Sequence, residues 1–235
     1  MTICYARTSA PSAKRIAEAG NIVITRSNVG DINWGRARAN TRLNPDISNA
    51  TNKRVMRELF AENDVPAPKL YKFPQHTLPA SSRWPMVGRP DQHTGGRGFW
   101  LCYNHNDVMR ALRGTRRKKA ATHFVEYINR TQAPREYRVH VFKGKSIRIS
   151  EKLFGSTGET AHGLYTTVKP THNVNHVRAA AKKAVAAIGL DFGAVDVLAS
   201  DTECWVTEVN AAPGLGGSMP QVYADAFQNW YDHAE

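Results

Sequence analysis

The amino-acid sequence predicts an α/β protein built from two α+β lobes that follow a short N-terminal segment. Strand-like runs precede helix-like runs in two successive groups, an order that is typical of α+β lobes. The chain has 235 residues, which is enough for one large domain or two small ones with a buried core. Hydrophobic residues make up 41% of the chain and charged residues 22%, as expected for a globular protein.

The first 50 residues have the least regular pattern. We expect a short strand at Ile3–Tyr5, a helix over Ser12–Ala19 and a second strand over residues 21–25 (NIVIT). Residues 28–40 (NVGDINWGRARAN) are rich in Asn, Gly and Arg, and this composition indicates a loop.

The pattern becomes regular at the start of the first lobe. Residues 52–64 (NKRVMRELFAEND) predict a helix, because their apolar side chains recur at helical spacing. Thr51 or Asn52 is available as the N-cap. Pro66 and Pro68 follow, and they force the chain into an extended path.

The remainder of the first lobe is predicted to be a small sheet with one helix. Residues 83–103 predict a strand, a glycine-containing turn and a second strand. Residues 106–114 predict a short helix that ends at Gly114. Residues 121–128 (ATHFVEYI) predict a further strand, because β-branched and aromatic side chains are frequent in them.

The second lobe is predicted to contain two hairpins and a helix. Residues 135–153 form the first hairpin, with a turn at Lys143-Gly144 where glycine accepts a positive φ. An Ala-rich helix is expected over residues 173–189, and the second hairpin over residues 193–210.

The second hairpin carries a candidate metal site. Side chains two residues apart share a face of a strand, so Glu208 and Asn210 lie together, with Val206 beside them. A three-residue connection at residues 201–203 places Asp196 directly opposite Glu208. Like charges in this position destabilise a sheet unless a cation lies between them, and Mg²⁺ prefers oxygen ligands of this kind. A solvated polar face, or a connection of another length, is the alternative.

A glycine-rich segment is a candidate anion-binding loop. Its backbone N–H groups can approach phosphate oxygens closely because glycine has no Cβ, and the fork-shaped donors of the arginines suit the same anion. An exposed glycine turn is the alternative, and no helix follows as it does in a P-loop. The residues are Arg89, Gly95, Gly96, Arg97 and Gly98.

In this order the segments from Asn52 to Gly214 resemble the ATP-grasp superfamily, and most closely the carboxylate–amine ligases similar to the ribosomal protein glutamate ligases. The resemblance implies an ATP-grasp fold, in which two lobes sandwich the nucleotide. It divides the chain into a truncated substrate segment at residues 1–50, an N-terminal lobe with a glycine-rich lid at 51–130, and a C-terminal lobe with the metal site at 131–235.

The resemblance also implies nucleotide-binding roles. Lys53 in the opening helix and Arg89 in the strand MVGRP correspond to residues that contact the nucleotide, and the glycine-rich loop corresponds to the lid over the triphosphate. The segment FVEYI corresponds to the hinge between the lobes, which implies that Glu126, Tyr127 and Ile128 hold the adenine. Apart from the resemblance, residues 31–40 (DINWGRARAN) are interpreted as a loop near the nucleotide cleft or the acceptor site.

The remaining implied roles concern the reaction. The stretch REYRVHV is similar to an acidic-x-Arg element, with Glu136 on the ribose hydroxyls and Arg138 at the reacting phosphate or acyl group. Lys152 is near the family's late basic residue. The implied ligands of one or two Mg²⁺ ions, with Mn²⁺ as an alternative, are Asp196, Glu208 and Asn210.

Three departures from the family pattern bear on the substrate and the phosphate geometry. The family usually has Lys at the position of Arg89, and its closest members often have Asp at that of Glu136. The first 50 residues are too few for the usual Rossmann-like substrate lobe.

The implied activity is ATP-dependent carboxylate–amine ligation, with a thiol as a rarer acceptor. A carboxylate of an amino acid, peptide or protein forms an acylphosphate, and a small-molecule amine then displaces phosphate to give an amide. Two alternatives remain: an ATP-grasp kinase that phosphorylates a hydroxyl, and a basic nucleic-acid-binding module.

The net charge of +12 implies an anionic partner, such as a nucleotide, a nucleic acid or an acidic peptide or protein. The densest cluster of positive charge is open to three interpretations: a solvated loop, a contact to a phosphate backbone, or a docking site for an acidic peptide or protein. It comprises Arg110, Arg113, Arg116, Arg117, Lys118 and Lys119.

The sequence favours a cytoplasmic protein with no membrane partner. No stretch approaches the roughly 20 apolar residues of a membrane span, and the N-terminus has no continuous apolar core of a signal peptide. Cys4, Cys102 and Cys204 are too widely spaced for a disulfide framework or a zinc site.

Overall fold

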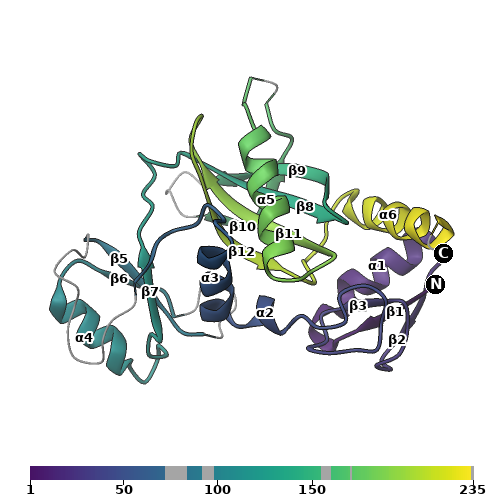
Figure 1. Ribbon diagram of the computed structural model, residues 1–235, viewed down its shortest axis with the longest axis horizontal. Helices are drawn as coiled ribbons and strands as arrows, with labels where there is room; N and C mark the ends of the chain where they lie inside the picture. Colours follow the sequence, from purple (N-terminus) through teal and green to yellow (C-terminus); the bar gives the residue numbers. More distant parts are fainter. Residues whose placement is uncertain (72–83, 92–97, 155–159, 170, 234–235) are drawn as a thin grey trace.

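Three sheets lie one after another along the molecule (Figure 1). The computed structural model describes residues 1–71, 84–91, 98–154, 160–169 and 171–233. A small parallel sheet lies at one end, a five-stranded antiparallel sheet in the middle and a four-stranded antiparallel sheet at the other end. The predicted mixed fold of helices and sheets is confirmed, whereas the domain boundaries near residues 50 and 130 stay predictions.

The N-terminal unit is a parallel sheet in the order β2-β1-β3. It contains β1 (Thr2–Tyr5), α1 (Ala10–Gly20), β2 (Val23–Thr25) and β3 (Ile32–Trp34). A short 3₁₀ helix over Arg7–Ser9 precedes α1. The prediction of a loop over residues 28–40 is wrong for β3, whose three side chains are all buried. The composition of residues 28–40 does not reveal this strand, because the buried run is only three residues long and the Gly and Arg residues around it indicate a loop.

The four-stranded sheet has the order β4-β7-β5-β6. Its strands are β4 (Leu70–Tyr71), β5 (Met86–Arg89), β6 (Trp100–Cys102) and β7 (His123–Glu126). The predicted strand-turn-strand is confirmed, since β5 pairs antiparallel with β6, although residues 92–97 of the turn lie outside the described residues.

The helix α4 (His105–Arg113) packs on this sheet through Val108 and Ala111. The side chain of Asn104 caps its first turn by accepting a hydrogen bond from Asp107 N at 3.1 Å. Gly114 ends the helix with a φ of 68°, as predicted.

The central sheet is antiparallel in the order β10-β9-β8-β11-β12. Its strands are β8 (Arg135–Phe142), β9 (Lys145–Phe154), β10 (Thr160–Thr166), β11 (Phe192–Ala199) and β12 (Cys204–Asn210). The strand β10 was not predicted from the sequence. The predicted turn at Lys143-Gly144 is confirmed, because both residues have positive φ, 46° and 72°, as a two-residue hairpin requires.

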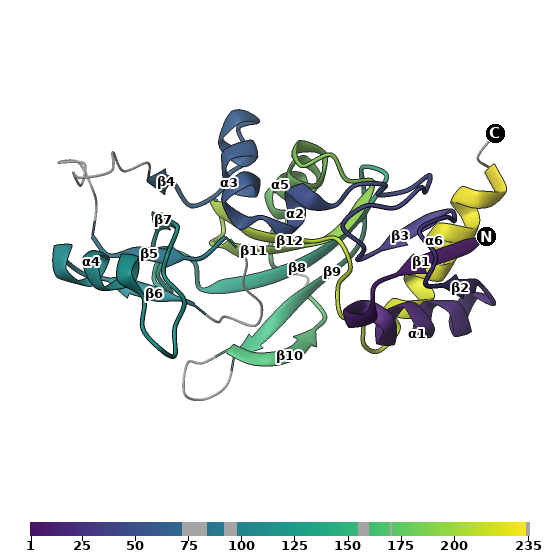
Figure 2. The same ribbon diagram turned by 90° about the horizontal axis from the view of Figure 1, so that it is seen from below.

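Helices cover one face of the central sheet (Figure 2). The helices are α2 (Ser48–Thr51), α3 (Lys53–Glu62) and α5 (Asn175–Ala187). The core between them and the sheet contains valines at alternate positions of the strands, such as Val139, Val195 and Val197. Asn52 caps α3, as predicted, by accepting from the N–H groups of Arg54 and Val55.

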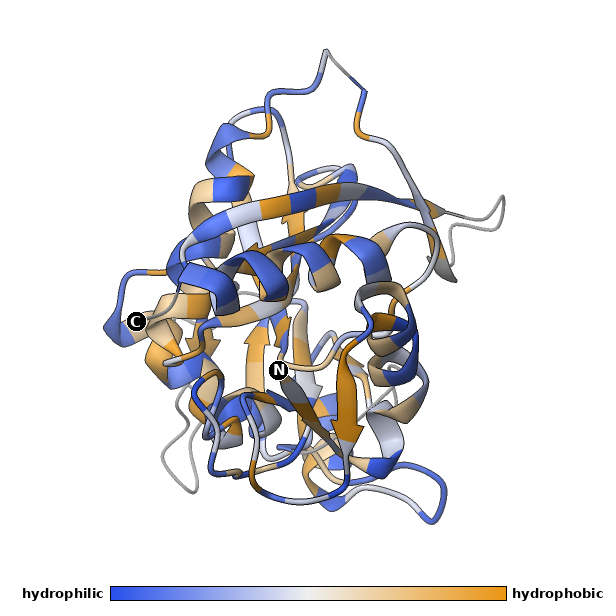
Figure 3. Ribbon diagram, turned by 90° about the vertical axis from the view of Figure 1, so that its right-hand side faces the viewer, coloured by the Kyte–Doolittle hydropathy of each residue, from blue (hydrophilic) through white to orange (hydrophobic). Residues whose placement is uncertain are grey.

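The last helix, α6 (Met219–His233), returns to the N-terminal unit and packs against α1. Figure 3 looks onto this end, where the helices carry alternating hydrophilic and hydrophobic residues. The helix α6 was not predicted from the sequence. An aromatic cluster joins α6, β3 and the central sheet: the Trp34 ring stacks on Phe192 at 5.6 Å and meets Tyr223 edge-on at 5.2 Å.

A buried asparagine also fixes the N-terminal unit to the central sheet. The side chain of Asn44 donates to Phe192 O at 3.0 Å and accepts from Asp191 N at 2.7 Å. The backbone N–H of Asn44 donates to the Asp191 carboxylate at 2.8 Å. The start of β11 is therefore bonded directly to the segment that follows β3.

The buried His140 makes stability depend on pH. Its side chain, 3% exposed, has Nδ1 3.0 Å from the Tyr223 hydroxyl oxygen. Burial, assisted by the charges of Arg138 and Arg148, lowers the pKa of His140 from 6.5 to about 3. Between these two values the unfolded chain binds a proton that the folded protein does not, so acid favours unfolding.

We expect the free energy of unfolding to fall as pH falls from 6.5 toward 3. His140 contributes up to about 1.4 kcal/mol per pH unit to this slope. Urea denaturation across this range should give a shallower slope for His140→Gln than for the wild type. An identical slope in both proteins would contradict the assignment, whatever the variant's absolute stability.

Candidate active site

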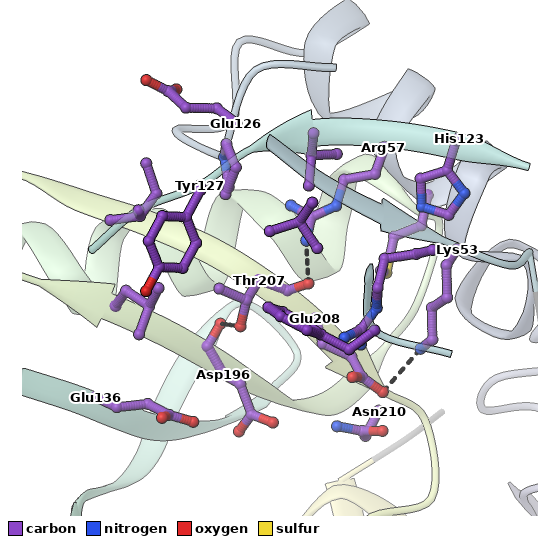
Figure 4. Close-up of a pocket in the computed structure, with 18 of the residues that line it drawn as sticks. Lys53, Arg57, His123, Glu126, Tyr127, Glu136, Asp196, Thr207, Glu208 and Asn210 are labelled. Carbon is purple, nitrogen blue, oxygen red and sulfur yellow. Dashed lines mark hydrogen bonds and ion pairs between the residues drawn. The ribbon is translucent and has the colours of Figure 1, made fainter. Parts of the chain in front are cut away.

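A cavity of about 590 Å³ is lined by the central sheet, the four-stranded sheet and α3. Figure 4 shows Glu126 and Tyr127 at one end of it and Lys53, Glu208 and Asn210 at the other. Most candidate residues predicted from the sequence line this one cavity: Lys53, Arg89, Glu126, Tyr127, Ile128, Glu136, Arg138, Lys152, Asp196, Glu208 and Asn210.

The predicted pairing of Asp196 with Glu208 is confirmed, although the connection between the two strands differs from the predicted one. Ala199 pairs with Cys204, so residues 200–203 connect the strands and the connection is one residue longer than predicted. A β-bulge then puts one extra residue, Thr207, into β12. The bulge cancels the longer connection and restores the expected partners.

The bulge also changes which residues share a face. The prediction that Val206 lies beside Glu208 is wrong, because Val206 is fully buried in the core on the helix side, together with Val209. Thr207 lines the cavity instead, and its hydroxyl donates to Asp196 O at 3.1 Å. Glu208 and Asn210 both line the cavity, as predicted.

Arg57 of α3 holds the bulge. Its guanidinium donates to Val206 O at 2.7 Å and also to Thr207 O. Burial, with the charge of Arg89, lowers the pKa of Arg57 to about 10, so it remains a cation at neutral pH. Arg57 was not among the residues predicted for the site. A signal was present, since the buried stripe of α3 has helical spacing and mixes two cations with apolar residues: Lys53, Met56, Arg57 and Phe60.

Two side-chain cations neutralise the acidic pair. Arg138 donates two parallel hydrogen bonds to the carboxylate of Asp196, from Nε to Oδ1 at 2.7 Å and from Nη2 to Oδ2 at 2.8 Å. Burial alone would lower the pKa of Arg138. The pKa is raised instead, because Arg138 donates hydrogen bonds to Asp196 and lies beside its negative charge. Lys53 Nζ lies 2.8 Å from Glu208 Oε1 and also donates to Ala50 O. Each of the two acids is thus paired with a side-chain cation, and the Mg²⁺ expected between them stays a prediction.

A third ion pair lies further along the same face. Lys152 Nζ on β9 donates to Glu136 Oε1 on β8 at 2.7 Å, and both side chains are largely buried. Tyr165 on β10 covers Arg138, whose Cζ is 4.9 Å from the centre of the tyrosine ring. Burial raises the pKa of Tyr165 to about 12, so its hydroxyl stays protonated at neutral pH.

The opposite end of the cavity is more apolar. Val87, Val125 and Leu198 line it, and the chain leaves β7 through Tyr127 and Ile128. The backbone of this segment is tied to the β4 side, because Glu126 N donates to Lys69 O at 2.9 Å. This end of the cavity thus combines apolar side chains with nearby backbone groups, as ligand pockets commonly do.

The glycine-rich segment is only partly described. Gly95, Gly96 and Arg97 lie outside the described residues, and Gly98 does not line the cavity. Gly98 has a φ of 79°, and a Cβ there would lie 2.7 Å from Pro90 Cγ, so the position requires glycine. Arg89 lines the cavity with its Cζ 5.5 Å from the centre of the Phe99 ring, and burial lowers its pKa.

His123 is another cavity residue that the sequence analysis did not select. Burial, with the charge of Arg57, lowers the pKa of His123 to about 4, and its Nδ1 lies 3.5 Å from Asp91 Oδ1. It is therefore neutral at neutral pH. A lone histidine in a strand carries no spacing signal, so only the fold brings it to the cavity. Thr207, Tyr165 and Phe99 also line the cavity, and they were missed for the same reason.

Within the described parts of the chain, no group of three or more His, Cys, Asp or Glu side chains is placed to hold a metal ion. Among the same residues, no helix combines the length and apolar composition needed to cross a membrane.

The cavity lies between two sheets, is apolar at one end and carries carboxylates and cations at the other, an arrangement typical of an enzyme site for a ligand with an apolar and a charged part. The profile of the RimK-like ATP-grasp domain matches residues 69–229, so the chain belongs to the RimK-like ATP-grasp family. This assignment confirms the predicted family and the predicted enzyme class, an ATP-dependent, ADP-forming carboxylate–amine ligase.

Solved structures show the same fold at low sequence identity. The D-alanine–D-alanine ligase from Bacillus anthracis has a TM-score of 0.69 and 13% identity, covering 98% of this chain and 95% of that one. A RimK domain ATP-grasp protein from Sphaerobacter thermophilus has a TM-score of 0.64 and 14% identity, covering 96% and 98%. An L-amino acid ligase from Bacillus licheniformis has a TM-score of 0.50 and 20% identity, covering 75% and 43%. No curated protein sequence gives a significant match.

The contact between Arg57 and the bulge should control both stability and the site. Arg57→Met leaves two buried carbonyl groups without their donor, so we expect unfolding to require about 2–4 kcal/mol less. ATP turnover should fall as well, because Glu208 directly follows the bulge.

Arg54→Met is the matched control for this prediction. Arg54 lies on the same helix, but its side chain is half exposed and its nearest carboxylate oxygen is 3.7 Å away. We expect a loss of less than about 1 kcal/mol. Equal losses in the two variants, measured by urea denaturation, would show that the bulge does not depend on Arg57.

Proposed function

We propose that this chain uses ATP to join a small-molecule amine to the carboxylate of an amino acid, peptide or protein. The observation that carries the proposal is the charge arrangement at one end of the cavity. Asp196, Glu208 and Asn210 lie there on two paired strands, with the cations Lys53 and Arg138 in direct contact with the two acids. The names of two similar structures, D-alanine–D-alanine ligase and L-amino acid ligase, support an amino-acid substrate.

In this proposal the nucleotide lies along the cavity. The adenine occupies the apolar end between Val87 and Leu198, with the backbone of residues 126–128 at its edge. Glu136 binds the ribose hydroxyls. The phosphates extend toward Lys53 and Arg89, and the segment with Gly95, Gly96, Arg97 and Gly98 closes over them.

The metal ligands we propose are Asp196, Glu208 and Asn210, for one or two Mg²⁺ ions or Mn²⁺ in their place. All three offer the oxygen atoms that such ions prefer, and nucleotide phosphates complete the ligand set. A bound ion would neutralise charge on the phosphates. Without it, Lys53 and Arg138 keep the two carboxylates neutralised in position.

The chemistry follows in two displacements. A substrate carboxylate oxygen attacks the γ-phosphorus of ATP, the bond to ADP breaks, and an acylphosphate forms. The amine nitrogen then attacks the acyl carbon, phosphate leaves, and the nitrogen loses a proton to give the amide. Arg138 and Lys152 are the residues that we assign to the oxygens of the reacting groups, where fixed cations stabilise developing negative charge.

Loss of a proposed metal ligand should abolish turnover without unfolding the protein. We expect Glu208→Ala and Asn210→Ala each to reduce ATP consumption by about a hundredfold or more, while circular dichroism stays unchanged. Glu203→Ala is the control, because this exposed acid lies in the connection of the same hairpin. Normal ATP consumption by either ligand variant would remove that residue from the proposed site.

The identity of the products separates the ligase from a kinase that shares the nucleotide site. With pools of amino acids and acidic peptides, we expect ADP and free phosphate in equal amounts together with an amide found by mass spectrometry. ADP without free phosphate, and a product heavier by one phosphoryl group, would identify a kinase instead.

A further inference from the structure

A second charged surface lies on the outer side of the four-stranded sheet, and the ligase activity does not account for it. In Figures 1 and 2, α4 lies at the end of the molecule opposite to the N-terminal unit. Its buried residues face the sheet, so its other side faces outward. We call this outward side and the turn after it the α4 surface: Met109, Arg110, Leu112, Arg113, Arg116 and Arg117, all exposed and none lining the cavity.

The charge of the α4 surface is not neutralised within the described residues. Asp107 is the single acid between residues 100 and 122, and its carboxylate accepts a hydrogen bond from Tyr103 N at 2.9 Å. None of the four arginines forms an ion pair with another described residue. Such a concentration of like charge is unfavourable alone and favours an anionic partner.

The backbone holds these arginines in a fixed arrangement. Thr115 and Lys118 exchange two backbone hydrogen bonds, 2.8 and 3.2 Å, which form a tight turn with Arg116 and Arg117 at its tip. Ala121 N donates to Ala111 O at 2.8 Å and ties the end of this turn back to α4. Lys118 Nζ lies 4.2 Å from the centre of the Trp100 ring. A preorganised surface loses less conformational entropy when a partner binds.

Apolar side chains lie next to the positive charges. Met109 is 36% exposed and Leu112 is 45% exposed. At helical spacing, Leu112, Met109 and Arg113 follow one another around the helix within an arc of about 100°. Arginine and methionine together are typical of protein–protein interfaces. A phosphate backbone has no apolar groups to complement Met109 and Leu112, whereas a peptide offers both carboxylates and apolar side chains.

We propose that the α4 surface is a docking site for an acidic segment of another polypeptide, in which apolar side chains are interspersed among the carboxylates. The carboxylates pair with the four arginines, and the apolar side chains cover Met109 and Leu112. This site is separate from the cavity, so it stands or falls independently of the proposed ligase function.

The test measures binding of two labelled peptides by fluorescence anisotropy. One repeats Glu-Glu-Leu and the other contains Glu alone at equal length. We expect the Glu-Glu-Leu peptide to bind the wild type more tightly, with an affinity that falls as salt is added. Arg113→Glu/Arg116→Glu should weaken its binding about tenfold or more. Met109→Ser/Leu112→Ser should weaken the Glu-Glu-Leu peptide several-fold and leave the poly-Glu peptide unchanged.

Lys14→Glu/Lys182→Glu is the matched control. It changes the net charge by the same amount, at exposed positions of α1 and α5. We expect it to bind the Glu-Glu-Leu peptide as the wild type does, and all variants to consume ATP at the wild-type basal rate.

Three results would overturn the proposal. The first is that the Lys14→Glu/Lys182→Glu control weakens peptide binding as much as Arg113→Glu/Arg116→Glu does, which would show that only the net charge matters. The second is tighter binding of an oligouridylate that the Arg113→Glu/Arg116→Glu variant loses, which would make the surface a nucleic-acid site. The third is the absence of peptide binding at low salt.

Discussion

The geometry of the cavity depends on the hydrogen bonds that Arg57 donates to the bulge of β12. An extra residue in a strand leaves carbonyl groups without a partner in the ladder, and the guanidinium of Arg57 supplies donors to Val206 and Thr207. On the outer side of the same strand, Val206 N donates to Pro66 O at 2.7 Å. The bulge is therefore satisfied from both α3 and the segment after it. Because the bulge resets the alternation of β12, Val206 enters the core while Glu208 and Asn210 face the cavity.

Local patterns of the sequence predicted what depends on local physics. The Lys143-Gly144 turn, the Asn52 cap and the antiparallel pair of β5 and β6 follow from patterns within one short stretch of the chain. The pairing of Asp196 with Glu208 was also predicted, but only because two errors cancelled. The bulge in β12 depends on a hydrogen-bond donor from a helix about 150 positions away in sequence. No local pattern of the sequence predicts such a contact.

The parts that the sequence did not predict are those that tertiary contacts create. The strand β3 is a buried run between Gly and Arg, and it is a strand because β1 and the aromatic cluster around Trp34 enclose it. The helix α6 gains its position from α1 and the same cluster. This N-terminal unit also holds the chain beyond β12, since Arg15 donates to Leu215 O at 2.6 Å and Leu215 N donates to Ser12 Oγ at 3.2 Å. The strand that ends in Asn210 is thus anchored beyond its end by α1.

Burial lowers the pKa of three basic groups that line the cavity, and this shift bears on what the cavity binds. Burial lowers the pKa of Arg57, Arg89 and His123, and the charges of the two arginines lower that of His123 further. Arg138 alone among these groups is raised, because it shares two hydrogen bonds with Asp196. Several cations of the cavity are therefore held away from water, where a charged group is costly unless an opposite charge lies nearby. In the proposed function the triphosphate of ATP supplies such charge, and its attraction to the cations is stronger in a desolvated site than in water.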